Sequence, residues 1–310
     1  MSDVRKHLLS GALSGLVSTV CLQPLDLLKT RMQQVDGTFP RSHNAMILET
    51  AREIFRTEGL RGLWRGTTPT LLRNIPGVAL YFTGLNYTRN ILSATSYFSV
   101  TPLHPPQNRS GSVLPKLSSQ GNLLAGAVAR VAVGVALNPV TVLKARYESN
   151  MYAYQSLPGA LLSLLRAGPS EVFRGVLASS LRDAPYAGLF VVCYEGIKND
   201  VSHLLAPASA TVSAGIHGFS AASAGVIATM ATHPFDVIKT KMQVRTEDRY
   251  HGLLKTVSTI WHVSNTLRLQ SQQRGVRGFF DGAALRVSRK PLSSALAWAV
   301  YEGMLMFMRT

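Results

Sequence analysis

Long apolar stretches alternate with short charged segments along the chain. Six of the apolar stretches are long enough to cross a membrane, and they cover residues 7–33, 67–91, 119–147, 177–200, 211–243 and 284–308. About 20 apolar residues, at a rise of about 1.5 Å each, span the hydrocarbon core of a bilayer. The pattern therefore predicts six membrane helices. Each stretch also contains charged residues, which inside a membrane usually mark function rather than lipid contact.

A different pattern separates the first two apolar stretches. The segment AMILETAREIFRTEG places apolar side chains at helical spacing, at Met46, Ile47, Ala51, Ile54 and Phe55. It is too charged to span a bilayer. We expect an amphipathic helix that lies along the membrane surface.

Three copies of one unit organise the chain. PLDLLKTRMQ at Pro24 recurs as PVTVLKARYE at Pro139 and as PFDVIKTKMQ at Pro234. Each copy has proline, an acid or Thr two residues later, Lys five residues later and a second base seven residues later. Such self-similarity is the signature of repeat architecture. We predict repeats at 1–95, 116–205 and 210–310, with the Pro- and Ser-rich segment 96–115 as a loop.

The second half of each copy repeats as well. EGLRGLWRG, AGPSEVFRG and RGVRGFFDG each end in a glycine, namely Gly66, Gly175 and Gly282. An arginine follows each of these glycines by seven residues, and these are Arg73, Arg182 and Arg289. Seven helical residues rise about 10 Å, so the three arginines are expected at one depth near the middle of the membrane.

Composition narrows the possible functions. The 310 residues carry a net charge of +16, which fits nucleic acid, an anionic membrane surface or an anionic ligand equally well. The long apolar spans speak against a soluble nucleic-acid-binding protein. Cys21 and Cys193 are too few for a disulfide framework, and we expect both to be small buried side chains.

Basic residues in the loops predict the orientation. Seven Lys or Arg side chains lie between Lys29 and Arg65, whereas the segment 93–118 holds only Arg109 and Lys116. Positive residues favour the inner compartment. Because the number of spans is even, both termini are expected on the same side as the segment 93–118, opposite the inner compartment.

The threefold pattern of proline, acid and two bases resembles the mitochondrial carrier family over nearly the whole chain. The resemblance implies an all-α membrane protein with six transmembrane helices in three pseudo-threefold repeats around a central cavity, with short matrix-side amphipathic helices. It places the chain in the inner mitochondrial membrane, with both termini facing the intermembrane space. It further implies a monomer that binds membrane lipid, cardiolipin included.

On the family pattern, the acids and lysines of the three repeats form a matrix gate. Pro24, Pro139 and Pro234 bend the helices so that their ends meet. The resemblance pairs Asp26 with Lys144 and Asp236 with Lys29, whereas Thr141 cannot form an ion pair with Lys239. Gln33 and Gln243 stand where the family places bracing glutamines, and Glu148 holds the third such position.

The family also has a cytosolic gate, which is weaker in this chain. Its positions are Asn86, Arg89, Glu195, Lys198 and Glu302. Asn86 is neutral and Leu305 replaces a base, so the family order leaves one pair, Glu302 with Arg89. We therefore expect the matrix-closed, cytosol-open state to prevail without substrate. Burying an ion pair costs desolvation energy, which can nearly cancel the attraction between the two charges. The size of this preference is therefore left open.

The expected substrate site lies between the gates, at Arg73, Gly77, Arg182, Asp183, Arg289 and Lys290. A zwitterionic amino acid presents one carboxylate and one ammonium group. Arginine binds a carboxylate bidentately, and Asp183 is the acid at this depth. The Arg182–Asp183 pair therefore favours an amino acid over a polyphosphate, although a fixed internal ion pair is an alternative reading.

The segments PVTVLKARYES, LRDAPYAGLF and LRVSRKPLSSALAWAVYEGM further resemble the glycine-transporting members of this family. This resemblance implies import of glycine from cytosol to matrix, where it supplies the first step of haem synthesis. Another small amino acid, a keto acid or a nucleotide-related solute remains an alternative cargo. The chain has no Walker loop, Rossmann fingerprint, nucleophile elbow or metal-ligand pair, so we expect no enzyme activity, cofactor or metal.

Overall fold

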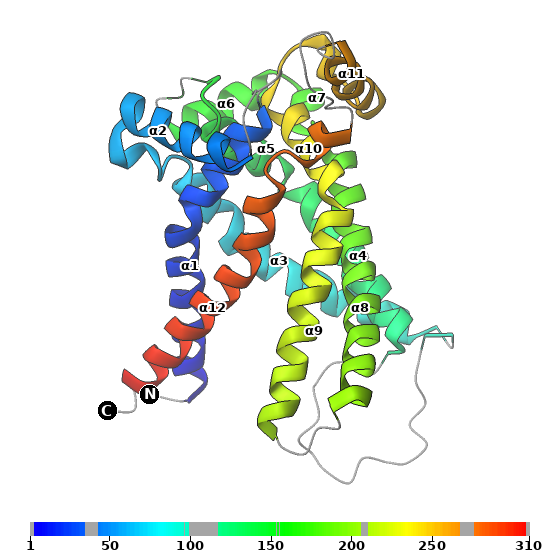
Figure 1. Cartoon of the computed structure of the whole chain (residues 1–310). Helices are drawn as coiled ribbons and strands as arrows, with labels where there is room; N and C mark the ends of the chain where they lie inside the picture. The colour runs from blue at the N-terminus through cyan, green and yellow to red at the C-terminus, as the bar shows by residue number, and fades with distance from the viewer. Residues whose placement is uncertain are drawn as a thin grey trace. The chain divides into compact units, whose positions relative to one another are not determined.

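The structure is a computed structural model that describes residues 3–34, 43–95, 97–98, 117–152, 154, 156–205, 210–266 and 276–307. These residues are almost entirely helical, in agreement with the predicted all-α class (Figure 1). The elements are, in order, α1 (Asp3–Gln34), α2 (His43–Gly62), α3 (Thr67–Ser93), α4 (Ser119–Ala136), α5 (Asn138–Glu148), α6 (Leu157–Arg166), α7 (Pro169–Val172), α8 (Val176–Leu205), α9 (Ala210–Ala231), α10 (His233–Val244), η1 (Asp248–Tyr250), α11 (Leu253–Thr266), η3 (Val276–Phe280) and α12 (Ala283–Phe307).

The chain divides into two compact units, and every repeat contributes to both. Unit 1 comprises residues 1–73, 138–178 and 233–310, and unit 2 comprises residues 74–137 and 179–232. Unit 1 contains the repeated proline motifs and the closing glycines. Unit 2 contains most of α3 and α8, together with α4 and α9. The predicted loop 96–115 lies outside the described residues except at 97 and 98.

The six apolar stretches are helical, as predicted, but two of them are each split into two helices. α4 ends at Ala136 and α5 begins at Asn138, just before Pro139. In the third repeat, α9 ends at Ala231 and α10 begins at His233, just before Pro234. Proline lacks an N–H and clashes with the carbonyl four residues earlier, which is why both breaks fall at these motifs.

The first repeat differs, because α1 continues through Pro24 without a break. Proline at this position leaves the carbonyl of Val20 without its usual intrahelical donor. The indole Nε1 of Trp64 donates to that carbonyl over 3.0 Å. A side chain from the segment after α2 thus satisfies the group that the proline frees.

Most of the predicted membrane helices are only moderately apolar. Within the described residues, one helical segment, 169–204, has the length and mean hydropathy of a membrane span by itself, and α4 with α5 qualifies when counted as one span. α1, for example, contains Asp26, Lys29 and Arg31. Large apolar side chains nevertheless stay exposed, including Phe82 and Val192 in unit 2. Such exposure suits contact with lipid rather than water.

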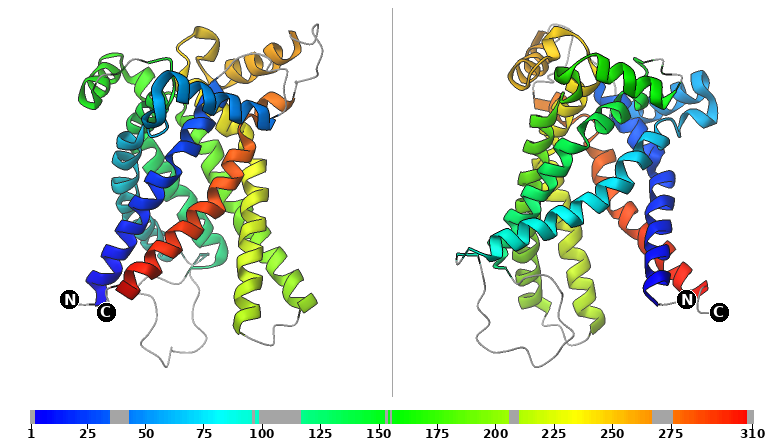
Figure 2. Two further views of the ribbon diagram at one scale, coloured as in Figure 1. Left: turned by 60° about the vertical axis from the view of Figure 1, so that its left-hand side comes forward. Right: turned by 180° about the vertical axis from the view of Figure 1, so that it is seen from behind.

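Three small cores in unit 1 attach a surface helix to each repeated motif. The first joins Leu27, Leu28 and Met32 of α1 to Ile54 of α2 and Leu285 of α12. The others comprise Val142, Leu164 and Val172 from α5, α6 and α7, and Val237, Ile238, Met242 and Ile260 from α10 and α11 with Ala178. α1 and α12 lie side by side along their length (Figure 2).

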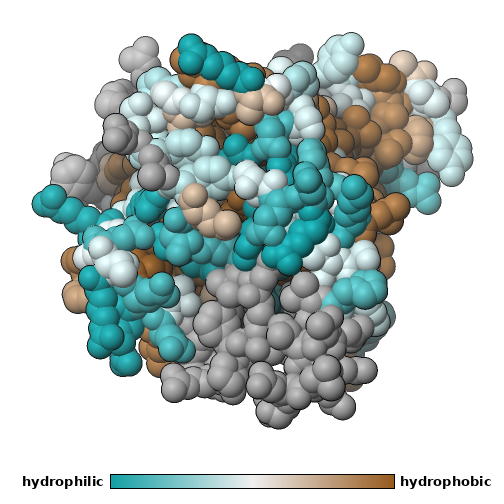
Figure 3. All heavy atoms as spheres, turned by 90° about the horizontal axis from the view of Figure 1, so that it is seen from above, coloured by the Kyte–Doolittle hydropathy of each residue, from teal (hydrophilic) through white to brown (hydrophobic). Residues whose placement is uncertain are grey.

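The amphipathic helix expected around 45–59 is α2, with Ile54 buried and Ile47 and Ala51 packed beside it. Phe55, expected on the same face, is instead 55% exposed. The expectation for Cys21 is also wrong, because this side chain is exposed on α1, while Cys193 is half-buried. The face that carries the surface helices shows many hydrophilic side chains, with apolar ones gathered toward one side (Figure 3).

Candidate functional site

The three closing glycines turn the chain at equivalent places in unit 1. Gly66, Gly175 and Gly282 have φ angles of 87°, 75° and 77°, a region that side chains other than glycine rarely adopt. A Cβ at Gly66 would lie 2.8 Å from Glu148 Cγ, and a Cβ at Gly175 would lie 3.0 Å from Gln243 Cγ. Each glycine therefore lets the next repeat's bracing residue pack directly against the turn.

The predicted ion pairs of the matrix gate are present within unit 1. Lys144 Nζ lies 2.9 Å from Asp26 Oδ2, and Lys29 forms an ion pair with Asp236. Both carboxylates are buried, at 7% and 1% exposure. The pairs link α1 to α5 and α10 to α1, so each joins two different repeats. The pairing inferred from the family order is confirmed, whereas the gating role remains a proposal.

Of the two glutamines expected to brace the gate, Gln33 contacts a gate acid, whereas the contact of Gln243 is to a backbone carbonyl. Gln33 Nε2 donates to Asp236 Oδ2 over 3.3 Å and to the carbonyl of Asp281 over 3.2 Å. Gln243 Nε2 donates to the carbonyl of Arg174 over 3.4 Å. The Glu148 side chain has no N–H to donate; it lies 3.4 Å from Lys144 Nζ and accepts a hydrogen bond from Thr30 over 2.7 Å.

Sequence reasoning missed the residue that precedes each proline. Gln23, Asn138 and His233 are buried, and each bonds the carbonyl just before a closing glycine. Gln23 and Asn138 donate to the carbonyls of Arg65 and Arg174 over 3.0 and 3.3 Å, and His233 Nε2 lies 3.0 Å from that of Asp281. The detectable signal was a polar residue before all three prolines.

Two of the arginines assigned to the substrate site contact gate positions. Arg73 Nε donates to Thr141 Oγ1 over 3.0 Å, and Arg289 Nε lies 2.5 Å from Asp26 Oδ1. The Arg289 contact is an ion pair without good hydrogen-bond geometry. Each arginine thus reaches the position two residues after the proline of the following repeat. The sequence predicted that these arginines lie above the gate but not that they contact it.

The arginine of the second repeat behaves differently. In unit 2, Arg182 Nε and Nη2 donate to the two carboxylate oxygens of Asp183 over 2.7 and 3.0 Å. The side chains are 15% and 21% exposed, so the pair remains partly accessible. A bidentate guanidinium–carboxylate contact is the geometry that an amino-acid carboxylate would also adopt.

The other predicted site residues divide between the two units. A Cβ at Gly77 would lie 3.2 Å from Leu137 Cδ1, so this glycine allows α3 to pack closely on the end of α4. The side chains of Lys290 and Glu302 lie outside the described residues. The expected Glu302–Arg89 pair therefore stays a prediction. Of the described side chains Asn86, Arg89, Glu195 and Lys198, none forms an ion pair with another.

A further cation in unit 2 was also missed. The guanidinium of Arg130 lies 4.9 Å from the ring centroid of Tyr81, a cation–π contact between α4 and α3. At the same distance before the motif proline, the other two repeats have Gly15 and Gly225. An arginine that breaks the threefold pattern inside a membrane helix is the signal that could have revealed it.

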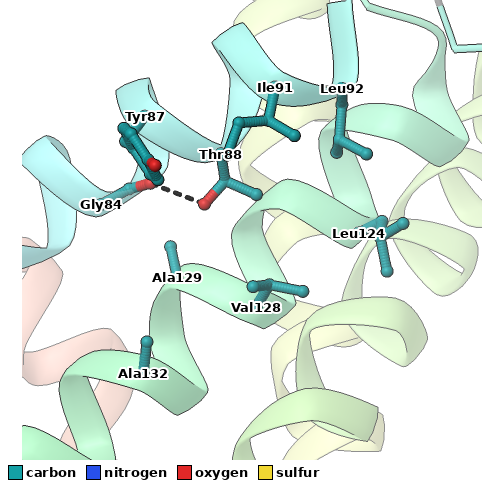
Figure 4. A pocket seen from close by; sticks show the side chains of 9 residues that line it. All are labelled: Gly84, Tyr87, Thr88, Ile91, Leu92, Leu124, Val128, Ala129 and Ala132. Atoms are coloured by element: carbon teal, nitrogen blue, oxygen red, sulfur yellow. Dashed lines mark hydrogen bonds between the residues drawn. The ribbon is translucent and has the colours of Figure 1, made fainter. Parts of the chain in front are cut away.

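An open groove of about 450 Å³ lies between α3 and α4 in unit 2 (Figure 4). Its walls are apolar and carry no ionisable side chain apart from the phenol of Tyr87, and Thr88 Oγ1 donates to the carbonyl of Gly84 over 2.7 Å. A zwitterion would find no charged partner there. Among the described residues, no cluster of His, Cys, Asp or Glu could hold a metal ion.

Interlocked helix ends, ion pairs between repeats and arginines within apolar helices define a membrane transporter built from three repeats. The family model for "Mitochondrial carrier protein" matches residues 2–96, 115–203 and 210–310. The chain therefore belongs to the mitochondrial carrier family, whose members are multi-pass proteins of the inner mitochondrial membrane with six transmembrane helices. Carriers of this family are transporters and not enzymes.

Similar proteins carry a more specific name. The chain is 60% identical to the mitochondrial glycine transporter of Laccaria bicolor, over 100% of this chain and 99% of that protein. It is 44% identical to the mitochondrial glycine transporter of Aspergillus niger and 42% identical to that of Coccidioides immitis. Each of these two alignments covers 97% of this chain and 89% of the relative.

Proposed function

We propose that this carrier imports glycine from the cytosol into the mitochondrial matrix by alternating access. The names of three full-length relatives support glycine as the substrate. The observation that carries the proposal is the bidentate Arg182–Asp183 pair, since a zwitterion requires one cation and one acid. In the matrix, the imported glycine would supply the first step of haem synthesis.

The pair offers a charge-balanced exchange. The glycine carboxylate replaces Asp183 on the guanidinium of Arg182, and the glycine ammonium binds the released Asp183 carboxylate. One ion pair becomes two, and no charge is left without a partner, which matters in a partly dehydrated site. A keto acid lacks the ammonium group, so it would leave Asp183 without a partner.

The gate contacts supply a link between binding and switching. Arg73 and Arg289 hold Thr141 and Asp26 in the closed gate. A substrate carboxylate that draws either arginine away weakens that end, and only differential binding to two states can shift their balance. Both gates respond to the same bound solute, so transport needs no covalent bond to form or break.

Uptake by the purified protein in liposomes tests the proposal. Radiolabelled glycine should accumulate, and a panel of larger amino acids and keto acids should compete weakly. Transport of another solute without glycine uptake would reject glycine while leaving the carrier class intact. The proposal also includes a monomer in contact with lipid, with both termini in the intermembrane space.

Replacement of Asp183 separates amino acids from keto acids. We expect Asp183→Asn to lower glycine uptake by about tenfold or more, because a hydrogen bond to a charged group contributes about 1.5–3 kcal/mol. The matched control is Asp200→Asn, since Asp200 is exposed on the same helix. Equal glycine uptake by the two variants would contradict the assigned role, and keto-acid transport retained by Asp183→Asn would favour the alternative cargo.

A further inference from the structure

The C-terminal ends of α1, α5 and α10 meet in unit 1. The last carbonyls of a helix have no intrahelical donor and carry the negative end of the helix dipole. They need donors from elsewhere, and a cation is the most favourable one. At this meeting point the donors are arginines from neighbouring repeats.

The first two contacts follow the repeated motif. Arg31 Nε donates to the carbonyl of Glu148 over 2.8 Å, from α1 to the end of α5. Arg146 Nε donates to the carbonyl of Gln243 over 3.2 Å, from α5 to α10. Both arginines stand seven residues after the motif proline, and both are buried.

The third contact closes the cycle with a residue outside the motif. The equivalent position in the third repeat is Lys241. One helical turn later, Arg245 donates to the carbonyl of Gln34 through Nε at 3.0 Å and Nη2 at 2.8 Å. Arg245 directly follows α10, so this contact runs from the C-terminal end of α10 back to the end of α1. The three helix ends are therefore joined in order, α1 to α5, α5 to α10 and α10 to α1.

Each arginine is also held by an acid of its own repeat. Arg31 pairs with Glu58, and Arg146 pairs with Glu171. Arg245 Nη1 lies 2.8 Å from Glu247 Oε1. The acid orients the planar guanidinium so that its remaining N–H groups point at the neighbouring helix, a geometry that a lysine ammonium cannot copy.

A buried tyrosine lies beside the cations that follow the third motif. Tyr250 is fully buried, and Lys241 Nζ lies 5.8 Å from its ring centroid. Arg245 and Arg249 approach the same ring at 5.8 and 5.2 Å. The Tyr250 side chain thus packs against all three cations, Arg245 among them.

We propose that Arg245 is a positioning residue for transport: it completes a ring of three arginines that keeps the matrix-side helix ends closed, and the carrier opens to the matrix only when this contact breaks. The proposal rests on the proposed transport function for its direction. It does not depend on glycine being the cargo, because the ring contains no residue of the substrate site.

The chain offers a matched control. Arg249 pairs with the same Glu247 and faces the same Tyr250 ring, but it is 45% exposed, and its ion pair and ring contact stay within its own repeat. Arg245→Gln and Arg249→Gln therefore remove the same charge from the same cluster. Of these two variants, Arg245→Gln is the one that removes the hydrogen bonds of Arg245 to the Gln34 carbonyl.

Thiol labelling of the full-length protein in the inner membrane tests the ring. Cys21 and Cys193 are replaced by Ser, and Ser18→Cys is added as reporter, because Ser18 is buried on α1. A membrane-impermeant maleimide is applied to mitoplasts and to inside-out vesicles. We expect Arg245→Gln to speed matrix-side labelling by about tenfold, the effect of a contact worth about 1.4 kcal/mol. Arg249→Gln should leave it unchanged.

The outcomes are decisive in both directions. An unchanged labelling rate in Arg245→Gln, equal acceleration from both sides, or the same effect in Arg249→Gln would overturn the proposal. If Arg245→Gln does not reach the membrane, Arg245→Lys decides, since it keeps the charge and loses the two-donor contact; no acceleration there also overturns it. If glycine uptake is absent but Arg245→Gln still speeds labelling from the matrix side, glycine is rejected as the substrate and the ring of three arginines is retained.

Discussion

Thr141 is the residue that most clearly distinguishes the second motif from the other two. It stands where the first and third repeats have Asp26 and Asp236. Its hydroxyl accepts a hydrogen bond from Arg73, so a neutral oxygen receives what a carboxylate would bind more strongly. The contact between repeats at Thr141 is therefore weaker than the contacts of the proposed gate that hold ion pairs.

Restoring an acid at this position should strengthen the closed state. We expect Thr141→Asp to raise the free energy of unfolding by about 1 kcal/mol, because a hydrogen bond to a charged group contributes about that much more than a neutral one. Glycine uptake should fall several-fold, since Arg73 would leave the gate less readily. Thermal unfolding and initial uptake rates measure the two effects, with Thr141→Asn as neutral control. Uptake as fast as in the parent would contradict the role of Thr141.

Gly66 is the residue where the backbone itself limits substitution. Its φ of 87° and the 2.8 Å approach of Glu148 Cγ leave no room for a side chain. We expect Gly66→Ala to lower the free energy of unfolding by about 1–3 kcal/mol. Gly134→Ala is the control, because nothing lies within 4 Å of a Cβ there. A Gly66→Ala protein with the parent's unfolding temperature would contradict this reading.

At the scale of elements, the three motif prolines act on their helices in two ways. Before Pro139 and Pro234 the helix breaks, whereas α1 passes through Pro24 intact. The carbonyl freed by Pro24 receives the indole N–H of Trp64. The same residue type therefore gives different local structure, depending on whether another segment supplies a donor.

The interaction between Pro24 and Trp64 can be measured by a double-mutant cycle. Trp64→Phe should lower the free energy of unfolding by about 1 kcal/mol, because the Val20 carbonyl loses its donor. In a Pro24→Ala background the same change should have less effect, since the alanine introduced there supplies the intrahelical N–H itself. Equal effects in both backgrounds would show that Trp64 does not serve this carbonyl.

The surface helices follow a simpler rule at this scale. α2, α6 and α11 each pack an apolar side against the helix that carries the repeated motif. Hydrophobic periodicity predicted the first of them from its own residues. The packing partners could not be read from the same segment, because the core that contains Ile54 also contains Leu285, which lies far along the chain.

Across the whole molecule, the two proposed gates differ in charge pairing. Among the described residues, the acids and lysines of the proposed matrix gate form two ion pairs between repeats, and Arg31, Arg146 and Arg245 add contacts to three carbonyls. The described residues of the proposed cytosolic gate make no ion pair with one another. We therefore expect the matrix-closed state to prevail without substrate.

Sided labelling tests this expectation. A single cysteine at Asn74, beside Arg73, should react faster with an impermeant maleimide from the intermembrane space than from the matrix. Glycine should reduce the difference, because bound substrate stabilises the state in which both gates are partly closed and so lowers the barrier to opening toward the matrix. Faster reaction from the matrix in the absence of glycine would reject the expected resting state.

Much of the site could be predicted because it repeats. Asp26 was paired correctly with Lys144, and Lys29 with Asp236, from the order that the family resemblance implies. Gln23 and Arg130 were missed for opposite reasons. Gln23 is one polar residue within an apolar stretch. Arg130 has no equivalent in the other two repeats, so it falls outside the threefold pattern on which the predictions were based.

Periodicity and spacing predicted the number of repeats and the helical class, because both are local properties of the chain, whereas the gate residues were expected from the family resemblance. The tertiary structure decided which group satisfies which partner. It showed that Arg73 contacts Thr141, that Arg289 contacts Asp26 and that Arg182 stays with Asp183. The first two of these contacts depend on where helix ends meet, and those meeting points join residues that lie far apart along the chain.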